Sequence, residues 1–202
     1  MAAPMDRAAA VRSALRVLVA RYGFHGASMS AVARQAGVAT GTAYTHYASK
    51  DDLVLAAYCE TKAELGAAAT AGLDAGAEAG AQFRRVWLAA YRHLEQNPEH
   101  ARFLLQVEHS PYRSAAHQAA IAAGDPLAAQ AAQPGIAARL LPLPLEVIYE
   151  LGLSPAVRLA ADETKLTGEQ LGEIACACWR AISQPARPSS LPVRYLHPEQ
   201  SI

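Results

Sequence analysis

The chain has 202 residues, enough for one ordinary domain or for two small ones that pack closely. Its three cysteines form no C-x-x-C pair, and we find neither a secretory leader nor an apolar run of transmembrane length, so we expect a cytoplasmic protein with no membrane partner. The formal net charge is zero, but residues 1–62 carry seven Lys/Arg against four Asp/Glu, whereas residues 63–202 carry eleven against fourteen. The N-terminal part is therefore positively charged and the rest of the chain negatively charged.

The first predicted helix covers residues 6–22. Its apolar stripe consists of Val11, Leu15, Leu18 and Tyr22. Arg12 and Arg16 fall on a different face of the same helix. The segment Gly23-Phe24-His25-Gly26 is expected to end it, because glycine is a common helix terminator.

Residues 28–47 predict two short helices joined by a glycine turn. Ser28 has the chemistry of an N-cap for a helix that carries Met29, Val32 and Ala33, and Gly37 suits a left-handed end to that helix. A second helix is expected from Ala39 or Thr40 to about Tyr47. This arrangement is typical of a helix-turn-helix motif, whose second helix enters the major groove of DNA, although an ordinary helical hairpin is the alternative.

The second helix has a polar outer face that suits phosphates and base edges. Its outward residues are Thr40, Gly41, Thr42, Tyr44, Thr45 and His46. His46 has a simpler alternative role as a partly exposed residue that ends the helix. After this helix, Ser49 and Asp52 resemble a capping box, and Lys50 is expected to contact a DNA phosphate.

The stretches RYGFHGAS, MSAVARQAGVATGTAYTHYASKDDL and LVLAAY together resemble the N-terminal domain of the TetR family of bacterial transcriptional regulators, over roughly residues 8–60. The resemblance implies that Ser28 touches a phosphate, that Thr40 to Thr42 and Tyr44 to His46 face the groove, and that Lys50 grips the DNA backbone. Four residues depart from the family pattern. Ala39 stands where many members have a capping serine, and Thr40 where many have lysine or arginine. Ala43 and His46 replace the more usual bulky apolar and aromatic residues.

The rest of the chain is rich in alanine, lacks strand alternation and predicts an all-α fold. We expect a helix-turn-helix domain at 5–65, a helical ligand-binding and dimerisation domain at 66–185 and a Pro-rich tail at 186–202. Within 66–185, helices are predicted from Gln82 to Asn97 and through Phe103 to about Ser110. Residues 111–139 predict one helix and a broken loop.

Two further predictions concern the C-terminal helices. A helix from about Leu145 should be kinked or interrupted at Gly152 and Pro155. Thr167 is expected to cap the final helix, with Gln170 as its capping-box partner.

A cavity for an apolar or aromatic effector is expected in the second domain. Its candidate ligand-binding residues are Trp87, Tyr91, Phe103, Gln106, Val107, His109, Tyr112 and Tyr149, with Phe83, Leu140 and Arg113 as further candidates. The alternative is that the aromatic residues belong to the core. Histidines 93, 100, 109 and 117 show no i, i+4 pair with a supporting carboxylate, so no metal or cofactor is expected.

The resemblance also implies a homodimer, in which helices at about 145–161 and 168–184 pair with those of a second subunit. The candidate interface residues are Leu171, Ala175, Cys178, Trp179 and Ile182. The alternative places this stripe in the core of one chain, and Cys176 and Cys178 are interpreted as small buried hydrophobic residues.

These features favour a homodimeric repressor that binds a palindromic double-stranded operator and is released by a small molecule. An activator, or a regulator controlled by a partner protein, is the main alternative. A helical enzyme is disfavoured, because the chain has no G-x-S-x-G, P-loop, zinc-helix or dinucleotide motif.

Overall fold

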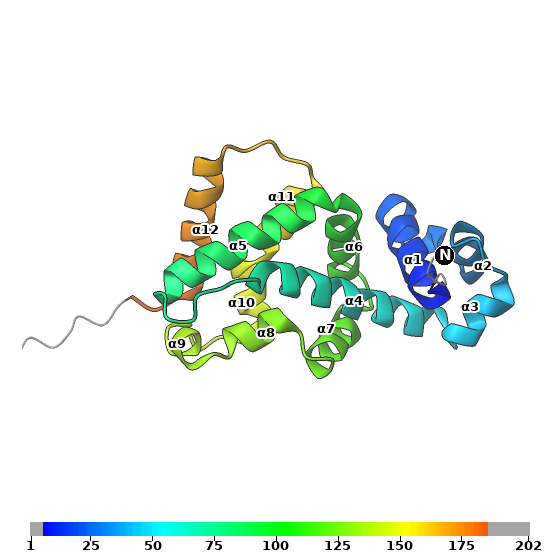
Figure 1. The fold of residues 1–202 in the computed structure, drawn as a ribbon, viewed down its shortest axis with the longest axis horizontal. Helices are drawn as coiled ribbons and strands as arrows, with labels where there is room; N and C mark the ends of the chain where they lie inside the picture. The colour runs from blue at the N-terminus through cyan, green and yellow to red at the C-terminus, as the bar shows by residue number, and fades with distance from the viewer. Residues whose placement is uncertain (1–5, 186–202) are drawn as a thin grey trace, which may run out of the picture.

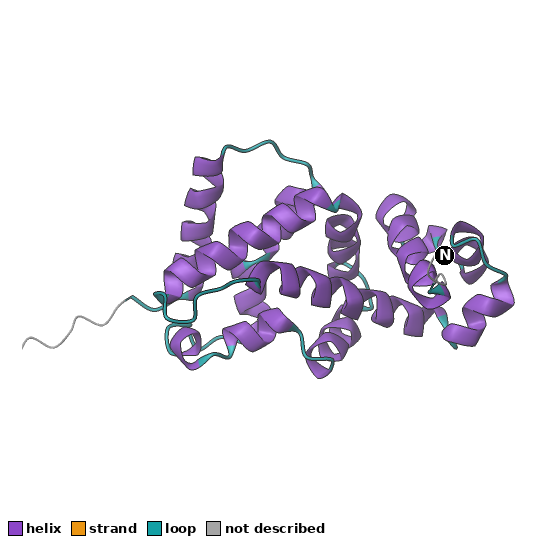
Figure 2. Cartoon of the chain, viewed as in Figure 1, coloured by secondary structure: helices purple, strands orange, loops and turns teal. Residues whose placement is uncertain are grey.

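The computed structural model describes residues 6–185, and this part of the chain consists of helices and their connections (Figures 1 and 2). Among these residues the only β-type pairing is an isolated bridge between Leu140 and Ser183. The all-α prediction is therefore confirmed, whereas the predicted tail at 186–202 lies outside the described residues.

A small N-terminal head forms one end of the molecule (Figure 1). Its elements are α1 (Arg7–Tyr22), a 3-10 turn (Phe24–Gly26), α2 (Met29–Gln35) and α3 (Thr40–His46). Val11, Leu15 and Leu18 of α1 are buried as predicted, but Tyr22 is 65% exposed. The prediction for Tyr22 was wrong because α1 ends there and Gly26 packs against its Cβ, which leaves the ring in solvent.

One helix joins the head to the body. The helix α4 (Lys50–Thr70) packs against α1 at its start and against the body helices α5, α7 and α8 further along. The division predicted at residues 65 and 66 thus falls inside a continuous helix. A second contact between head and body is made by α6 (Pro98–Glu108), which packs against α1.

The body is a bundle of short and medium helices around an aliphatic and aromatic core. Besides α4 and α6 it contains α5 (Ala79–Gln96), α7 (Arg113–Ala122), α8 (Pro126–Ala131), α9 (Pro134–Ala137), α10 (Leu145–Gly152), α11 (Ser154–Ala161) and α12 (Gly168–Ile182). The region predicted as one helix and a loop is three helices, because Pro126 and Pro134 each start a helix, a position that proline favours.

The predicted C-terminal features are present. The helix that starts at Leu145 is interrupted after Gly152, and Pro155 lies in the first turn of α11. At the start of α12, the Gln170 amide donates to Thr167 Oγ1 at 3.2 Å, and the Thr167 amide donates to Gln170 Oε1 at 2.9 Å. This reciprocal pair is the predicted capping box.

Gly66 allows α4 and α8 to approach closely, and its replacement by alanine should destabilise the fold. An added Cβ would lie 2.9 Å from the Cβ and Cδ atoms of Pro126, whose ring cannot rotate away. Alanine in a helix gains up to about 1 kcal/mol over glycine, but overpacking costs about 1–3 kcal/mol. We therefore expect Gly66→Ala to lower the free energy of unfolding by about 1 kcal/mol in urea titrations. Gly168→Ala, where a Cβ meets nothing, is the control; equal effects at both positions would contradict the close approach.

Candidate functional site

The turn between α2 and α3 has the geometry expected of a helix-turn-helix. Ser28 Oγ accepts a hydrogen bond from the Ala31 amide at 3.2 Å and so caps α2. Gly37 adopts a φ of 69°, which favours glycine, and the following Val38 amide donates to the Ala33 carbonyl at 3.0 Å. These bonds end α2 and direct the chain into α3.

The two faces of α3 differ in burial. Ala43 is fully buried and anchors the helix on the head, while Tyr44 is 52% exposed. The other predicted DNA-binding residues are exposed at Ser28, Thr40, Gly41, Thr45 and His46 and half-buried at Thr42. Ala39 makes no side-chain cap for α3. The Thr45 hydroxyl donates to the Gly41 carbonyl at 3.0 Å, so only its oxygen lone pairs remain for DNA.

Lys50 is more engaged than the sequence indicates. Its ammonium donates a hydrogen bond to the Phe24 carbonyl and lies 5.9 Å from the centroid of the Phe24 ring. Ser49 caps α4 by accepting from the Asp52 amide at 3.0 Å and donating to Asp52 Oδ2 at 2.7 Å. Lys50 therefore ties the start of α4 to the turn after α1, and any phosphate would share its ammonium with that carbonyl.

An ion-pair network fixes α3 to α1 and α4. Glu60 on α4 accepts from Arg12 Nη2 at 2.6 Å and from Arg16 Nη1 at 2.5 Å. Arg12 Nη1 also donates to the Tyr47 hydroxyl at 2.6 Å, just after the end of α3. Burial alone would raise the pKa of Glu60, but the two guanidinium groups lower it below its ordinary value. Arg12 and Arg16 on α1 thus connect α4 to the residue that follows α3.

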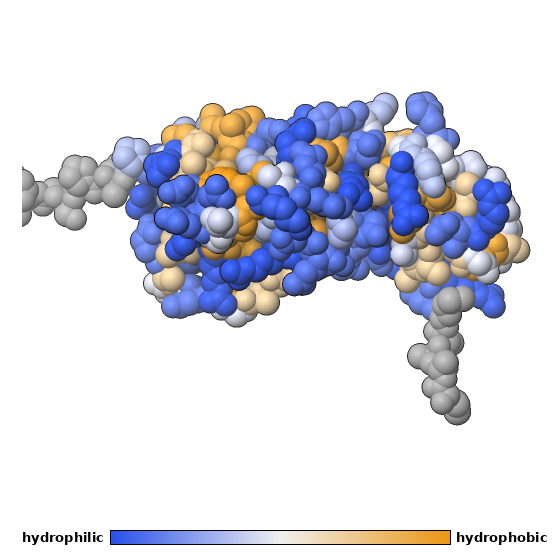
Figure 3. Space-filling model, turned by 90° about the horizontal axis from the view of Figure 1, so that it is seen from above, coloured by the Kyte–Doolittle hydropathy of each residue, from blue (hydrophilic) through white to orange (hydrophobic). Residues whose placement is uncertain are grey.

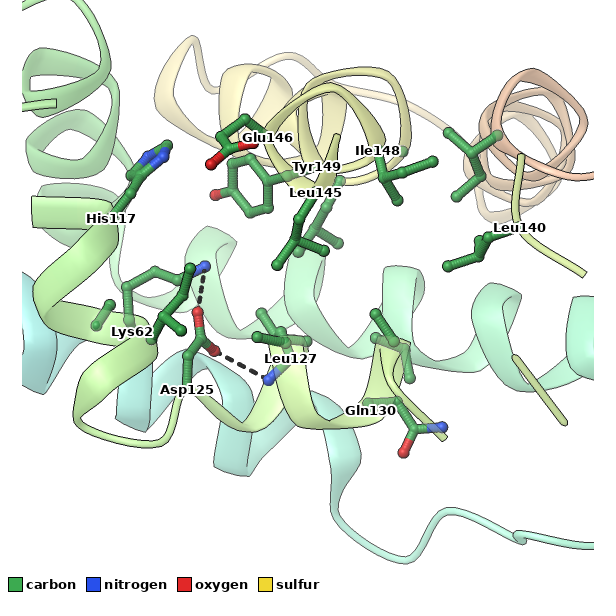
Figure 4. A pocket seen from close by; sticks show the side chains of 18 of the residues that line it. Lys62, His117, Asp125, Leu127, Gln130, Leu140, Leu145, Glu146, Ile148 and Tyr149 are labelled. Atoms are coloured by element: carbon green, nitrogen blue, oxygen red, sulfur yellow. Dashed lines mark hydrogen bonds and ion pairs between the residues drawn. The ribbon is translucent and has the colours of Figure 1, made fainter. Parts of the chain in front are cut away.

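A second candidate site is a cavity in the body, with about 970 Å³ of space including its open mouth. Helices α4, α5, α7, α8, α10 and α12 contribute to its lining. Aliphatic side chains such as Leu140 and Ile148 lie at one end, and Lys62, His117, Asp125 and Tyr149 gather at the other (Figure 4). This mostly apolar lining, with a few polar groups gathered at one end, is typical of small-molecule sites.

The polar end of the cavity centres on a buried ion pair. Lys62 Nζ lies 3.1 Å from Asp125 Oδ2, and both side chains are almost fully buried. Asp125 Oδ1 accepts from the Leu127 amide at 2.9 Å and so caps α8, while Lys62 Nζ lies 4.4 Å from the Tyr149 ring centroid. Burial would lower the pKa of Lys62, but its surroundings, chiefly Tyr149 and Asp125, raise it above the ordinary value. Lys62 is therefore a charged ammonium.

A second pair lies beside it. His117 Nε2 is 2.5 Å from Glu108 Oε1, and the His117 ring stacks on Tyr58 with centroids 5.9 Å apart. Burial opposes ionisation of Glu108, but His117 and Arg113 lower its pKa below the ordinary value. Because Glu108 ends α6 and α6 packs on α1, this pair connects the cavity lining to a helix that touches the head.

Most of the predicted ligand-binding residues lie elsewhere. Tyr149 lines the cavity, as do Phe83 and Leu140. The residues buried in the core instead are Trp87, Tyr91, Phe103 and Val107. They lie in α5 and α6, which both pack against α11, and the Trp87 indole donates to the Gly152 carbonyl at 3.1 Å.

The predicted polar anchors are also outside the cavity. Gln106, His109 and Arg113 are exposed, and the Tyr112 hydroxyl donates to Asp51 Oδ1 at 2.7 Å on α4. The polar residues missed by the sequence prediction are Tyr58, Lys62, His117 and Asp125. One signal was available, since Gly124-Asp125-Pro126 is a helix start with a carboxylate cap.

The predicted interface stripe on α12 is largely internal. Ala175, Cys178 and Ile182 are buried within the single chain, so they have almost no surface to offer a second subunit. Leu171 and Trp179 are half-buried, and the Trp179 ring lies 5.3 Å from that of Phe83. In the single chain, Ala175, Cys178 and Ile182 therefore belong to the core. Cys178 is a buried cysteine as predicted, whereas Cys176 is exposed.

No three His, Cys, Asp or Glu side chains converge as a metal site within residues 6–185. Of the helices in that same range, none has both the length and the apolar character needed to cross a membrane.

Two family descriptions match the sequence. Residues 11–57 match "Bacterial regulatory proteins, tetR family", and residues 79–183 match "Tetracyclin repressor-like, C-terminal domain". An uncharacterised HTH-type transcriptional regulator of Haemophilus influenzae is 28% identical over 187 residues, which are 90% of this chain and 98% of the relative.

Solved structures of regulators are similar along most of the chain. A TetR-family regulator from Haemophilus influenzae has a TM-score of 0.67 at 28% identity, covering 89% of this chain and 97% of the other. A putative tetR family regulator from Shewanella sp. PV-4 has a TM-score of 0.71 at 23% identity, with coverages of 89% and 99%. The second likeness is evidence for the fold alone.

Proposed function

Because the chain belongs to the tetR family of bacterial regulatory proteins, and is thus a DNA-binding transcriptional regulator and not an enzyme, we propose that it acts as a homodimeric repressor released from its operator by a small molecule. The observation that carries this proposal is the path of α4. The same helix starts at the head with Lys50 and contributes Lys62 to the cavity. A molecule that changes the position of α4 therefore acts on both sites.

We propose that the exposed face of α3 reads DNA. Thr42, Tyr44 and His46 offer hydrogen-bonding groups to base edges, and Ser28, the N-cap of α2, is assigned to a phosphate. Lys50 keeps two ammonium hydrogens beyond its bond to Phe24, and these are assigned to the DNA backbone. Since residue 40 is threonine, where many family members have lysine or arginine, DNA binding depends less on a cation at the start of α3 than it does in those members.

A revised surface is proposed for the dimer. On α10, Val147 and Leu151 are 38% and 42% exposed, and on α12 the small residues Cys176 and Ala177 are exposed. Figure 3 shows apolar areas on the body, away from the head, between polar side chains. Small residues let helices approach closely, and exposed apolar groups gain from burial, so these faces suit pairing with a second copy.

The ligand acts only through a difference in affinity between two states of the protein. A molecule that binds the free and the DNA-bound arrangement equally well shifts nothing. The Glu108–His117 pair and α4 are the two connections by which an occupied cavity would alter the position of the head.

Gly41→Ala should separate folding from DNA binding. A Cβ at this position meets no protein atom, so alanine should stabilise α3 by up to about 1 kcal/mol. On the proposed DNA-facing surface, the same methyl group would keep the backbone from the groove, and we expect affinity to fall about tenfold in fluorescence-anisotropy titrations. Unchanged affinity together with a higher melting temperature would show that Gly41 does not approach DNA.

The function itself is tested by selecting bound sequences from a random DNA pool with the full chain. A palindromic site, bound by two chains in analytical ultracentrifugation, is the expected result. A reporter gene placed behind this site should then be repressed. Reporter activation would favour the activator alternative, and a non-palindromic site bound by one chain would contradict the dimer.

A further inference from the structure

The cavity is chemically asymmetric, and its polar end restricts what it can hold. Lys62 carries a buried ammonium with three hydrogens. In the part of the chain that the structure describes, its one hydrogen-bond acceptor is Asp125, and one side of the ammonium faces the Tyr149 ring. A hydrogen therefore remains for a molecule in the cavity, and Figure 4 shows the ammonium beside the open space.

The neighbouring polar groups are also donors. The hydroxyl groups of Tyr58 and Tyr149 make no hydrogen bond to another described residue, although Tyr58 is almost fully buried. Burial, and next the charges around it including Glu108 and Asp125, raise the pKa of the Tyr58 phenol, so it remains protonated. The lining of the cavity thus includes an ammonium and two phenols, each of which can donate a hydrogen bond to an acceptor oxygen.

Charge decides between an anionic and an uncharged acceptor. The Lys62 charge is already balanced by Asp125, and Asp125 is held in place as the cap of α8. The Glu108 carboxylate beside the same end is itself paired with His117 and Arg113, and Glu146 adds a further carboxylate to the lining, so no cation that the structure describes at this end lacks a partner. A carboxylate ligand would add an unbalanced negative charge in a buried site, and an amine would face the Lys62 ammonium; both arrangements are costly.

We propose that the effector is an uncharged, largely apolar carbonyl compound whose oxygen accepts a hydrogen bond from Lys62 Nζ. A carbonyl oxygen satisfies the free donor without changing the charge of the site, and it requires no acceptor in return. Its hydrocarbon part lies toward Leu140 and Ile148, where the lining is aliphatic (Figure 4). This inference rests on the proposed ligand-binding role of the cavity and defines the ligand's chemistry.

Calorimetry on the full chain without DNA tests the class. Two matched series serve as probes: 2-undecanone, undecanoate and undecylamine, and 2-acetylnaphthalene, 2-naphthoate and 2-naphthylmethylamine. In at least one series the ketone should bind about tenfold more tightly than the acid and the amine. Tighter binding of an acid or an amine in both series, or binding of none of the probes, overturns the proposal.

Variants of the ion pair test the role of Lys62. Asp125→Asn keeps a good helix cap but leaves the ammonium unbalanced, so the preference should change from ketone to acid. The double variant Lys62→Met with Asp125→Asn keeps the site neutral, and its ketone affinity should fall about tenfold. Lys165→Met, at an exposed lysine outside the cavity, should bind the ketone as the original chain does. If Asp125→Asn still preferred the ketone and the double variant bound the ketone as tightly as the original chain, Lys62 would be excluded as the anchor.

The ligand class and the proposed release of DNA fail separately. If the ketone binds as expected but leaves the affinity for the selected DNA site unchanged, the repressor mechanism is wrong and the ligand class stands. If the acid binds instead and releases DNA, the ligand class is wrong and the mechanism stands.

Discussion

Lys62→Met is expected to lower the free energy of unfolding by about 3 kcal/mol, because it leaves the Asp125 carboxylate buried without its cation. Methionine has a similar length and fills the space under the Tyr149 ring, so the loss reflects charge more than packing. Urea titration monitored by circular dichroism measures the change. The same variant should lose the close contact between α4 and the start of α8.

The matched control combines Lys62→Met with Asp125→Asn. Replacing both members of a buried ion pair by uncharged groups is often neutral or stabilising, so the double variant should recover most of the lost stability. Together with Asp125→Asn alone, these variants form a double-mutant cycle. If the single and double variants were equally unstable, the destabilisation would come from packing and not from the unpaired carboxylate.

Glu60→Gln is expected to weaken DNA binding strongly and to lower stability by about 2 kcal/mol. The change removes the negative charge that faces Arg12 and Arg16, and the buried Arg16 then lacks its counterion. The figure is below that for a fully buried pair because Glu60 retains some exposure. Since Arg12 also binds the Tyr47 hydroxyl, the end of α3 should lose its fixed position.

A DNA-binding measurement and a matched control variant separate the effects of Glu60→Gln on folding and on recognition. Anisotropy titrations at a temperature where the variant is folded should show at least a tenfold loss of affinity for the selected DNA site. Glu64→Gln, a more exposed α4 carboxylate one turn later, is the control and should bind DNA normally. Normal DNA affinity in Glu60→Gln would show that the ion pairs of Glu60 with Arg12 and Arg16 contribute to stability and not to DNA binding.

The head was predictable because its signals are local. The cap at Ser28 and the turn at Gly37 are decided by neighbours within a few residues, and the structure contains both of them. The sequence places Arg12 and Arg16 on a polar face of α1, but it does not identify their partner Glu60, which lies 44 residues beyond Arg16. Such pairing depends on how helices pack, which periodicity alone does not specify.

The cavity was poorly predicted for a related reason. An aromatic stripe has the same spacing whether it faces a core or a cavity, and the stripe with Trp87 and Tyr91 faces the core. The polar groups that line the cavity come from α4, α7 and the start of α8, which are distant in sequence. Nothing in the sequence around Lys62 indicates that it is buried, because its partner Asp125 is distant in the chain.

The continuity of α4 limits how this protein can be recombined with its relatives. An α-helix turns by about 100° and rises about 1.5 Å with each residue, so a chimera that gains or loses one residue in α4 would rotate its head relative to its cavity. The angle between the two recognition helices of a dimer would change with it. A chimera that exchanges the heads of two relatives must therefore conserve the number of residues between Lys50 and Lys62.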